Sequence, residues 1–270
     1  MVSPSLDTIL EPFSFLYRYR KLLYQTILND IKVRYAGSLL GLSWILLYPL
    51  IFLLIYAITY VFVFRIQMQT LSEVDYVLFI FCGLIPFLGF VESLGYGIGS
   101  VTRNTNLIKN TLFPIDLIPV KDVLASQITQ IISFFLLVIS LILFKKITVW
   151  VLMIPVIWIL QLLFTIGLLW ILSSANVYIK ELQNNVNIIC LILMIASPIA
   201  YTLDMIPKMF QFILYLNPLY YIIVLYQDCL IFGQSPQYDI LIVLTVFSFG
   251  FFYIGYWFFS KMKKVIIDNV

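Results

Sequence analysis

Long apolar runs separated by short polar connections dominate the pattern of this chain. The first run, from Tyr35 to Phe64, is thirty residues without a charge. As a helix it would be about 45 Å long, more than the roughly 30 Å of a bilayer's hydrocarbon core. Further apolar stretches follow at intervals. The pattern predicts six membrane spans, at about 35–64, 76–102, 123–144, 150–175, 182–203 and 240–260.

The first 34 residues mix charged and apolar positions in a different way. Leu23, Ile27 and Ile31 are spaced four apart, which places them on one face of a helix. Over the whole segment, apolar residues are interleaved with charges, at Asp7, Glu11, Arg18, Arg20, Lys21, Asp30, Lys32 and Arg34. The segment 1–34 is therefore predicted to be an amphipathic helix on the membrane surface, ahead of a transmembrane domain over 35–264 and a short tail over 265–270.

The junction between these two parts has the residues expected where a chain enters a membrane. Arg34 can extend its charged end to the headgroups, and Tyr35 and Trp44 are typical interfacial anchors. Gly41 lacks a side chain and lets another helix approach closely. These four residues are predicted to form the membrane entry, and an ordinary first span with a basic flank would also explain them.

Two of the polar connections are unusual. In the loop 103–122, Leu107, Ile108 and Leu112 form a short apolar face, and Pro114 and Pro119 then end and redirect the helix. A loop that merely joins two spans does not need such a face. The region 204–239 holds apolar pieces that are each too short to cross a bilayer and are interrupted by proline and glycine. Such pieces are typical of re-entrant or interfacial helices.

Composition supports an integral membrane protein. Sixty-three percent of the residues are hydrophobic and 11% are charged, with a mean hydropathy of +1.05, against roughly 45–50% and 25% in soluble domains. No cleaved signal peptide is predicted at the N-terminus. The three cysteines lack metal-site spacing and are interpreted as small buried apolar residues.

The distribution of lysine and arginine predicts the orientation. With the N-terminus inside, twelve of these residues lie in inside segments and four in outside segments. Basic residues favour the cytoplasmic side, so both termini of this multi-pass protein of the plasma or inner membrane are predicted to be cytoplasmic. The region 204–239 then faces outward.

The sequence offers little enzymatic chemistry. It has no histidine, no GxxxxGK[ST] phosphate-binding loop and no GxSxG nucleophile motif. Glu92 is the single charge well inside a predicted span, and a buried carboxylate is a candidate functional residue because its insertion costs roughly 2.5–3.5 kcal/mol or more. A hydrogen bond to a neighbouring helix would explain Glu92 equally well.

Several motifs, in order along the chain, resemble one family. Asp30-Ile-Lys-Val-Arg34-Tyr35, Phe81-Cys-Gly-Leu-Ile-Pro86-Phe87 and the loop from Asn104 to Pro119 resemble the entry segment, second span and coupling-helix loop of type 2 ABC-exporter permeases that export polysaccharides such as O-antigen, capsule and teichoic acid. Further resemblances are Asn176-Val-Tyr-Ile-Lys-Glu181, Ser197-Pro-Ile-Ala-Tyr201 and Asn217-Pro218-Leu219. Phe87 and Gln227 stand where the family frequently has tryptophan and arginine.

The resemblance implies an all-α membrane protein with an N-terminal interfacial helix, six spans, a cytoplasmic coupling helix and two outward re-entrant helices. It further implies a homodimer in contact with membrane lipids, paired with two copies of a separate ABC ATPase subunit that binds ATP and Mg. The substrate would be a lipid-linked polysaccharide moved outward. This chain would then hold no cofactor or metal and have no catalytic site, and no nucleic-acid partner is expected.

Two sets of site residues follow from the resemblance. The predicted ATPase coupling residues lie in the loop between spans two and three: Asn106, Leu107, Ile108, Lys109, Phe113 and Pro114. The predicted exit gate or conduit residues lie around the re-entrant region: Ser197, Pro198, Tyr201, Asn217, Pro218 and Tyr220.

Other functions remain open from the residues alone. An ATP-independent channel or secondary carrier would favour more intramembrane charges or an inverted repeat. A membrane-embedded glycolipid enzyme would need an acid/base pair or metal ligands at a membrane face. A type 2 ABC exporter of drugs or small lipids is a nearer alternative.

Overall fold

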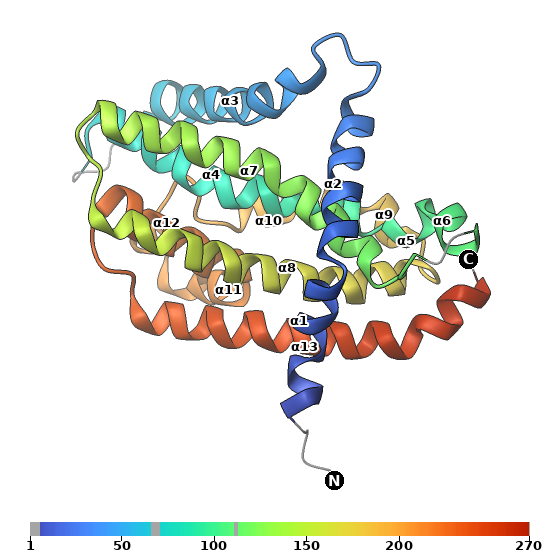
Figure 1. Ribbon diagram of the computed structural model, residues 1–270. Coiled ribbons are helices and arrows are strands. Elements are labelled where there is room, and N and C mark those ends of the chain that lie inside the picture. Colours follow the sequence, from blue (N-terminus) through green and yellow to red (C-terminus); the bar gives the residue numbers. More distant parts are fainter. Residues whose placement is uncertain (1–5, 66–70, 111–112, 270) are drawn as a thin grey trace.

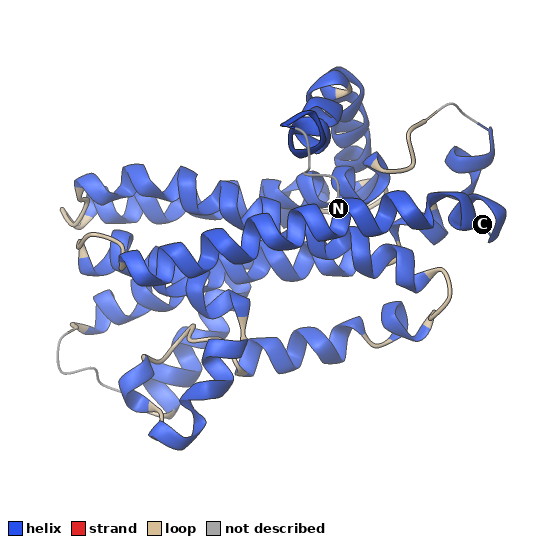
Figure 2. Cartoon of the chain, turned by 90° about the horizontal axis from the view of Figure 1, so that it is seen from below, coloured by secondary structure: helices blue, strands red, loops and turns tan. Residues whose placement is uncertain are grey.

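The computed structural model describes residues 6–65, 71–110 and 113–269, apart from the side chains of 6–10, 106, 110, 268 and 269. Within these ranges the protein is helical and contains no strand (Figure 2). Five helices are long and apolar enough to cross a membrane, and a sharply bent helix pair could count as a sixth span. The all-helical prediction is confirmed at this level.

The helix α4 (Glu73–Gly97) lies at the centre of the bundle (Figure 1). Ser72 caps its first turn by accepting a hydrogen bond from the backbone N–H of Asp75 at 3.3 Å. The helix continues through Pro86, and most of its residues are buried against α7 (Leu117–Leu143), α12 (Pro218–Gln227) and their neighbours. A helix that is apolar all round and covered on all sides forms the core of the fold.

The helices α8 (Ile154–Asn176) and α13 (Tyr238–Asn269) form the most extensive pair. They cross at Gly167 and Gly255 with backbone against backbone. A Cβ atom at Gly255 would lie 2.1 Å from the carbonyl oxygen of Gly167, and one at Gly167 would lie 2.3 Å from that of Phe251. Glycine is required here because any side chain would push the two helices apart.

The N-terminal helices run across the bundle axis instead of along it (Figure 1). The single helix predicted over 1–34 is two helices, α1 (Leu6–Arg18) and α2 (Arg20–Tyr35). The chain then turns at Gly37 and Gly41, whose φ angles of 78° and 50° favour glycine.

The first membrane-spanning helix follows this turn. A 3-10 turn at Gly41–Ser43 leads into α3 (Trp44–Ala57), which ends in a π-helical segment at Ile58–Val63. The first span therefore begins at Gly41, later than the predicted 35. Most large side chains of α3 are exposed, which distinguishes it from α4.

Shorter helices fill the two ends of the bundle. One end, here called the α6 end, holds α5 (Ser100–Arg103), α6 (Thr105–Asn110), α9 (Glu181–Asn184) and the C-terminus (Figure 1). The sharply bent pair runs over Lys208–Leu216 and Pro218–Phe232, with an angle of 98°. Its parts are a 3-10 turn at Lys208–Phe210, α11 (Gln211–Leu216), α12 and a π-helical segment at Asp228–Phe232. Two more 3-10 turns lie at Val149–Met153 and Leu203–Met205.

The structure differs from the prediction most clearly over 182–203. Instead of one spanning helix, the segment has α9 and the ten-residue α10 (Val186–Ile195). The helix ends ahead of Pro198, because the residue before a proline is driven out of the helical conformation.

Two other helices extend beyond the ends predicted for their spans. Helix α7 begins at Leu117, six residues before the predicted third span. Helix α13 continues through the predicted tail to Asn269, because Ile266 is fully buried and Lys263 pairs with the Asp116 carboxylate.

Candidate functional site

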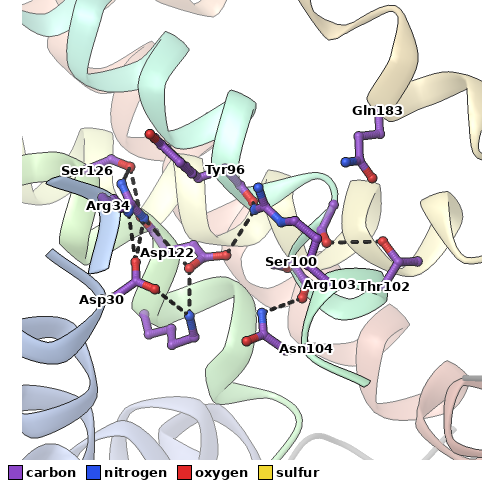
Figure 3. Close-up of polar contacts among 12 residues, drawn as sticks. Asp30, Arg34, Tyr96, Ser100, Thr102, Arg103, Asn104, Asp122, Ser126 and Gln183 are labelled. Carbon is purple, nitrogen blue, oxygen red and sulfur yellow. Dashed lines mark hydrogen bonds and ion pairs between the residues drawn. The ribbon is translucent and has the colours of Figure 1, made fainter. Parts of the chain in front are cut away.

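Six ionisable side chains meet where α2 crosses α4 and α7, and Figure 3 labels Asp30, Arg34, Arg103 and Asp122 among them. We call this group the charge cluster. It contains three carboxylates and three cations: Asp30, Glu92, Asp122, Arg34, Arg103 and Lys121. The Arg103 side chain is 42% exposed, and the other five groups can be desolvated together because each buried charge has a partner of opposite sign.

Arg34 is the centre of the charge cluster, and its side chain is only 6% exposed. Its Nε donates to Asp30 at 2.8 Å and its Nη1 donates to the Ser126 hydroxyl at 2.9 Å. The guanidinium also lies 3.6 Å from Glu92 and 3.7 Å from the centroid of the Tyr96 ring. A planar fork with several donors suits such multiple binding. Arg34 therefore fixes α2 to α4 and α7.

Asp122 joins the two ends of the loop that contains α6. Arg103, at the end of α5, lies 3.6 Å from the Asp122 carboxylate and donates to the backbone oxygen of Tyr96. Lys121 bonds both Asp122 at 2.9 Å and Asp30 at 3.0 Å. The base of the loop is thus closed by an ion pair and bonded to α2.

A cavity of about 480 Å³ lies directly beside the charge cluster. We call it the entry cavity. Three predicted candidates from separate segments, Tyr35, Trp44 and Glu92, come together in its wall. Gly41 lies in the turn before Trp44 and is not among the lining residues. The Trp44 indole is held in place because its Nε1–H donates to the Ser38 hydroxyl at 3.1 Å. The structure therefore brings Tyr35, Trp44 and the buried acid Glu92 to one cavity, with Arg34 beside Glu92 and Gly41 outside the lining.

The predicted coupling residues lie at the α6 end. Lys109 is exposed on α6, whereas Ile108 and Phe113 are half-buried and pack against the core of the same chain. Leu107 is half-buried as well, and Pro114 accepts the backbone N–H of Leu117 at 3.0 Å. The side chain of Asn106 lies outside the described part.

Three of the predicted gate residues, Ser197, Pro198 and Asn217, meet in a second polar site, which contains no charged side chain. We call it the α12 turn, defined by Ser197, Pro198, Asn217 and Gln227. Asn217 caps α12 by accepting the Leu219 N–H at 3.0 Å, and it donates to the Ala196 carbonyl and the Ser197 hydroxyl, both at 3.0 Å. A buried amide that makes all of these bonds leaves little polar surface unsatisfied.

Gln227 completes the α12 turn by donating to the Pro198 carbonyl at 3.0 Å. The backbone of Ile199 packs so closely on Gly83 that an added Cβ there would lie 3.0 Å from the Ile199 Cα. The motifs Phe81–Phe87, Ser197–Tyr201 and Asn217–Leu219 thus meet at one point. A glutamine is sufficient for this contact where the resemblance had suggested an arginine.

The remaining predicted gate residues separate from one another. Tyr201 and Ser197 line a cavity of about 290 Å³ together with the stacked rings of Tyr56 and Tyr60, whose centroids are 5.6 Å apart. The Tyr201 hydroxyl donates to the Ile195 carbonyl at 2.8 Å. Tyr220 is buried at 4% exposure, away from that cavity, and Pro218 occupies the first turn of α12.

Sequence reasoning missed the other members of the charge cluster and a buried amide pair. The sequence places Lys121 and Asp122 at the end of the predicted loop 103–122, although their position beside an apolar run is a usable signal that they belong to a helix. Gln130 donates to Gln161 at 2.8 Å, and Gln161 donates to the Pro86 carbonyl at 2.9 Å. Polar residues inside predicted spans were the available signal for this pair.

In the part of the chain that the structure describes, no group of three or more histidine, cysteine or acidic residues is arranged to hold a metal ion. The charge cluster is a neutral ion network and not a ligand set. Its chemistry is positional: it fixes helices and orients a carboxylate at the edge of a cavity.

Comparison with known proteins gives consistent results. The family model described as ABC-2 type transporter matches residues 26–231. The chain is 30% identical over 240 residues to the O-antigen export system permease protein RfbA of Klebsiella pneumoniae, covering 87% of this chain and 89% of that protein. It is 27% identical over 258 residues to the protein of the same name in Myxococcus xanthus, covering 94% and 97%. It is 24% identical over 261 residues to the polysialic acid transport protein KpsM of Escherichia coli, covering 90% and 93%.

Proposed function

The chain belongs to the ABC-2 type transporter family, and from this premise we propose that it is the permease subunit of an ATP-driven exporter of lipid-linked polysaccharide. The observation that carries the proposal is the likeness, over most of the chain, to permeases named for O-antigen export and polysialic acid transport. The substrate is accordingly a polysaccharide of the O-antigen, capsule or teichoic-acid type, moved outward across the membrane.

The energy for export comes from a separate ATPase subunit. The chain is a multi-pass membrane protein of a transport-subunit family, and its sequence has no phosphate-binding loop. ATP and Mg therefore bind to the partner. Two permease copies and two ATPase copies form the working assembly in this proposal.

The α6 end faces the cytoplasm. The excess of lysine and arginine in the segments that meet there supports this orientation, because basic loops stay on the cytoplasmic side. Both termini are then cytoplasmic. Helix α2, which crosses the bundle near this end, lies along the inner membrane surface, and α11 and α12 form the two re-entrant helices of the outward side.

Helix α6 is the element that receives the movement of the ATPase. It is short, ends shortly before Pro114, and carries the exposed Lys109. Ile108 and Phe113 both pack on the core of their own chain. They therefore serve this contact in two ways, by presenting their exposed part to the partner and by transmitting its displacement inward.

The charge cluster then distributes that displacement. Arg103 and Asp122 hold the two ends of the loop together, and Arg34 and Lys121 bind them to α2. A shift of α6 therefore moves α2, α4 and α7 together, since separating any of them would leave a buried charge unpaired. Glu92, at the edge of the entry cavity, moves with the same group.

The proposed homodimer encloses the polysaccharide. The described part of one chain offers at most six spans, too few to surround a hydrated polymer with a wide lumen. The exposed apolar side chains of α3 supply a surface for lipid and for a second copy. The cavity lined by Tyr201 and Ser197 lies on the outward part of the path and represents the exit.

The test is export in a cell that lacks this chain. The expected result is that lipid-linked polysaccharide accumulates inside, and that surface polysaccharide, measured with lectin or antibody, returns only when this chain and its ATPase are both supplied. The control is an ATPase with an inactivated phosphate-binding loop. Normal surface polysaccharide without this chain would contradict the proposal, and restored drug efflux instead would favour the alternative of a small-molecule exporter.

A further inference from the structure

The entry cavity has lining groups that the membrane-entry role does not explain. Four aromatic rings from three helices face it, those of Tyr35, Trp44, Tyr48 and Tyr96. Trp44 and Tyr48 are 38% and 37% exposed, so their faces are open. Anchoring a helix at the membrane surface requires aromatic rings that face lipid, not rings gathered around one hollow.

The polar groups of the cavity are placed for binding. The Glu92 carboxylate supplies acceptors, and its orientation is fixed by Arg34 at 3.6 Å. Asn187 on α10 is exposed and adds an amide with two donors and an acceptor. The Thr129 hydroxyl lines the same cavity, is 1% exposed, and lies within hydrogen-bonding reach of the Glu92 carboxylate and the Tyr35 hydroxyl. It therefore adds a third polar group beside Glu92 in the wall of the cavity.

The charges narrow the class of ligand. None of the described lining residues is a cation, and Arg34, which pairs with Glu92, is also engaged with Asp30 and Asp122, so the cavity wall has no group to hold a phosphate or an acidic sugar. The Glu92 carboxylate would itself repel an anion. A neutral polyol fits better, because its hydroxyls bond to carboxylate and amide groups while its C–H faces lie on aromatic rings. The volume of about 480 Å³ lies within the roughly 300–1,000 Å³ of small-molecule sites.

We infer that the entry cavity binds one neutral sugar residue of the exported polysaccharide at the cytoplasmic side, with Glu92, Thr129 and Asn187 as its hydrogen-bonding groups. This inference rests on the proposed function. It makes the cavity a specificity-determining subsite, since a site built to bond hydroxyl groups rejects analogues that lack them. The same charge cluster that ties α6 to α2 also orients the carboxylate of the subsite.

A larger side chain at Gly95 would fill this cavity. Gly95 lies in its wall, and a Cβ atom added there would meet nothing within 4 Å. Gly95→Leu should therefore occupy the cavity without disturbing the packing of α4. Gly250→Leu is the matched control, because Gly250 is also helical, has nothing within 4 Å and lies on α13, outside the cavity lining.

The experiment uses the full-length permease in nanodiscs and saturation-transfer NMR with methyl glycosides of mannose, galactose and N-acetylglucosamine as probes. At least one glycoside is expected to receive saturation through its C–H face from wild type and Gly250→Leu, and not from Gly95→Leu. Asn187→Ala should weaken that binding by about tenfold, the equivalent of one good hydrogen bond. Asn184→Ala, also exposed on the same side of the fold, should not.

Export in cells separates this inference from the proposed function. Gly95→Leu is expected to lower surface polysaccharide strongly while Gly250→Leu leaves it normal. If Gly95→Leu exports normally and no glycoside binds, the subsite is overturned but the exporter is not. If wild type itself does not restore export, the proposed function fails. Saturation transfer to choline without transfer to any glycoside would also overturn the sugar assignment, because aromatic cages with a carboxylate bind quaternary ammonium groups.

Discussion

The charge cluster and the α12 turn each join neighbouring helices through side-chain contacts, but they do so with different chemistry. The charge cluster uses carboxylates and cations to join α2, α4 and α7. The α12 turn uses neutral amides and hydroxyls to join the end of α10 to α12. Desolvating charges is far more expensive than desolvating amides, so the first network depends on every partner, whereas the second loses its bonds one at a time.

This contrast fits the positions of the two sites. The charge cluster lies beside the loop proposed to receive a mechanical input, where an all-or-none network makes the helices move together. The α12 turn lies on the side proposed for exit, where separate neutral bonds permit local rearrangement. The following substitutions test the contrast, in order of decreasing effect on stability.

The largest effect is expected for Arg34→Met. Removing the cation leaves three carboxylates without their shared partner, and breaking a buried pair in this way costs about 3–5 kcal/mol. The measurement is SDS-induced unfolding of the purified protein in mixed micelles.

Lys32→Met on the same helix is the control for Arg34→Met, because Lys32 is exposed and should change the unfolding free energy little. Equal destabilisation of the two variants would mean that the charge cluster has no special role in holding α2.

An intermediate effect is expected for Asn217→Ala. It removes the cap of α12 and two hydrogen bonds to the Ala196 and Ser197 oxygens, with an expected loss of about 2–3 kcal/mol. Asn217→Ser, which keeps a capping oxygen, should recover part of the loss. A drop as large as that of Arg34→Met would show that the α12 turn is as cooperative as the charge cluster.

A smaller effect is expected for Tyr201→Phe. The change removes only the hydroxyl that donates to Ile195 at 2.8 Å, at a cost of about 1 kcal/mol. Tyr178→Phe serves as its control, because Tyr178 is exposed. If Tyr201→Phe unfolds like Asn217→Ala, the Ser197–Tyr201 segment is more strongly coupled than its separate bonds indicate.

The smallest effect on stability is expected for Lys109→Glu, within about 0.5 kcal/mol, because the side chain is exposed on α6. Its effect on function should nonetheless be large. Co-purification of the ATPase and surface polysaccharide should both fall, since the reversed charge would repel the acidic groups of the ATPase with which we propose that Lys109 pairs.

Lys180→Glu is the matched control for Lys109→Glu, because Lys180 is exposed and precedes α9 at the same end. Normal export by Lys109→Glu, or an equal loss by Lys180→Glu, would contradict a docking role specific to α6.

The parts of the fold that sequence could predict are those determined by local chemistry. The fourth span, predicted at 150–175, corresponds to the helical segment Val149–Asn176, because an uninterrupted apolar run between polar ends has one solution in a membrane. Asn217-Pro218 marked a helix start, and Asn217 does cap α12. Over 182–203, hydropathy alone predicted a span, although Pro198 ends the helix early.

The charge cluster could not be predicted in the same way. Arg34 and Asp122 are 88 positions apart, and no local pattern in one sequence indicates that they meet. The same is true of the Lys121 and Asp30 pair, 91 positions apart. Glu92 was found because a charge within a span is conspicuous by itself. Its partner Arg34 was assigned to the headgroups, and burial at 6% exposure shows that it serves the protein interior instead.

The glycine crossing of α8 and α13 has a mechanical consequence. Main chain touches main chain at Gly167 and Gly255, so no rotamer change can absorb sliding between the two helices, and the pair is stiff. Helix α13 extends this stiffness to the α6 end, where Lys263 pairs with Asp116 just before α7. The push that we propose at α6 would therefore work against a rigid support, and the deflection would fall on α3, which has few buried side chains to resist it.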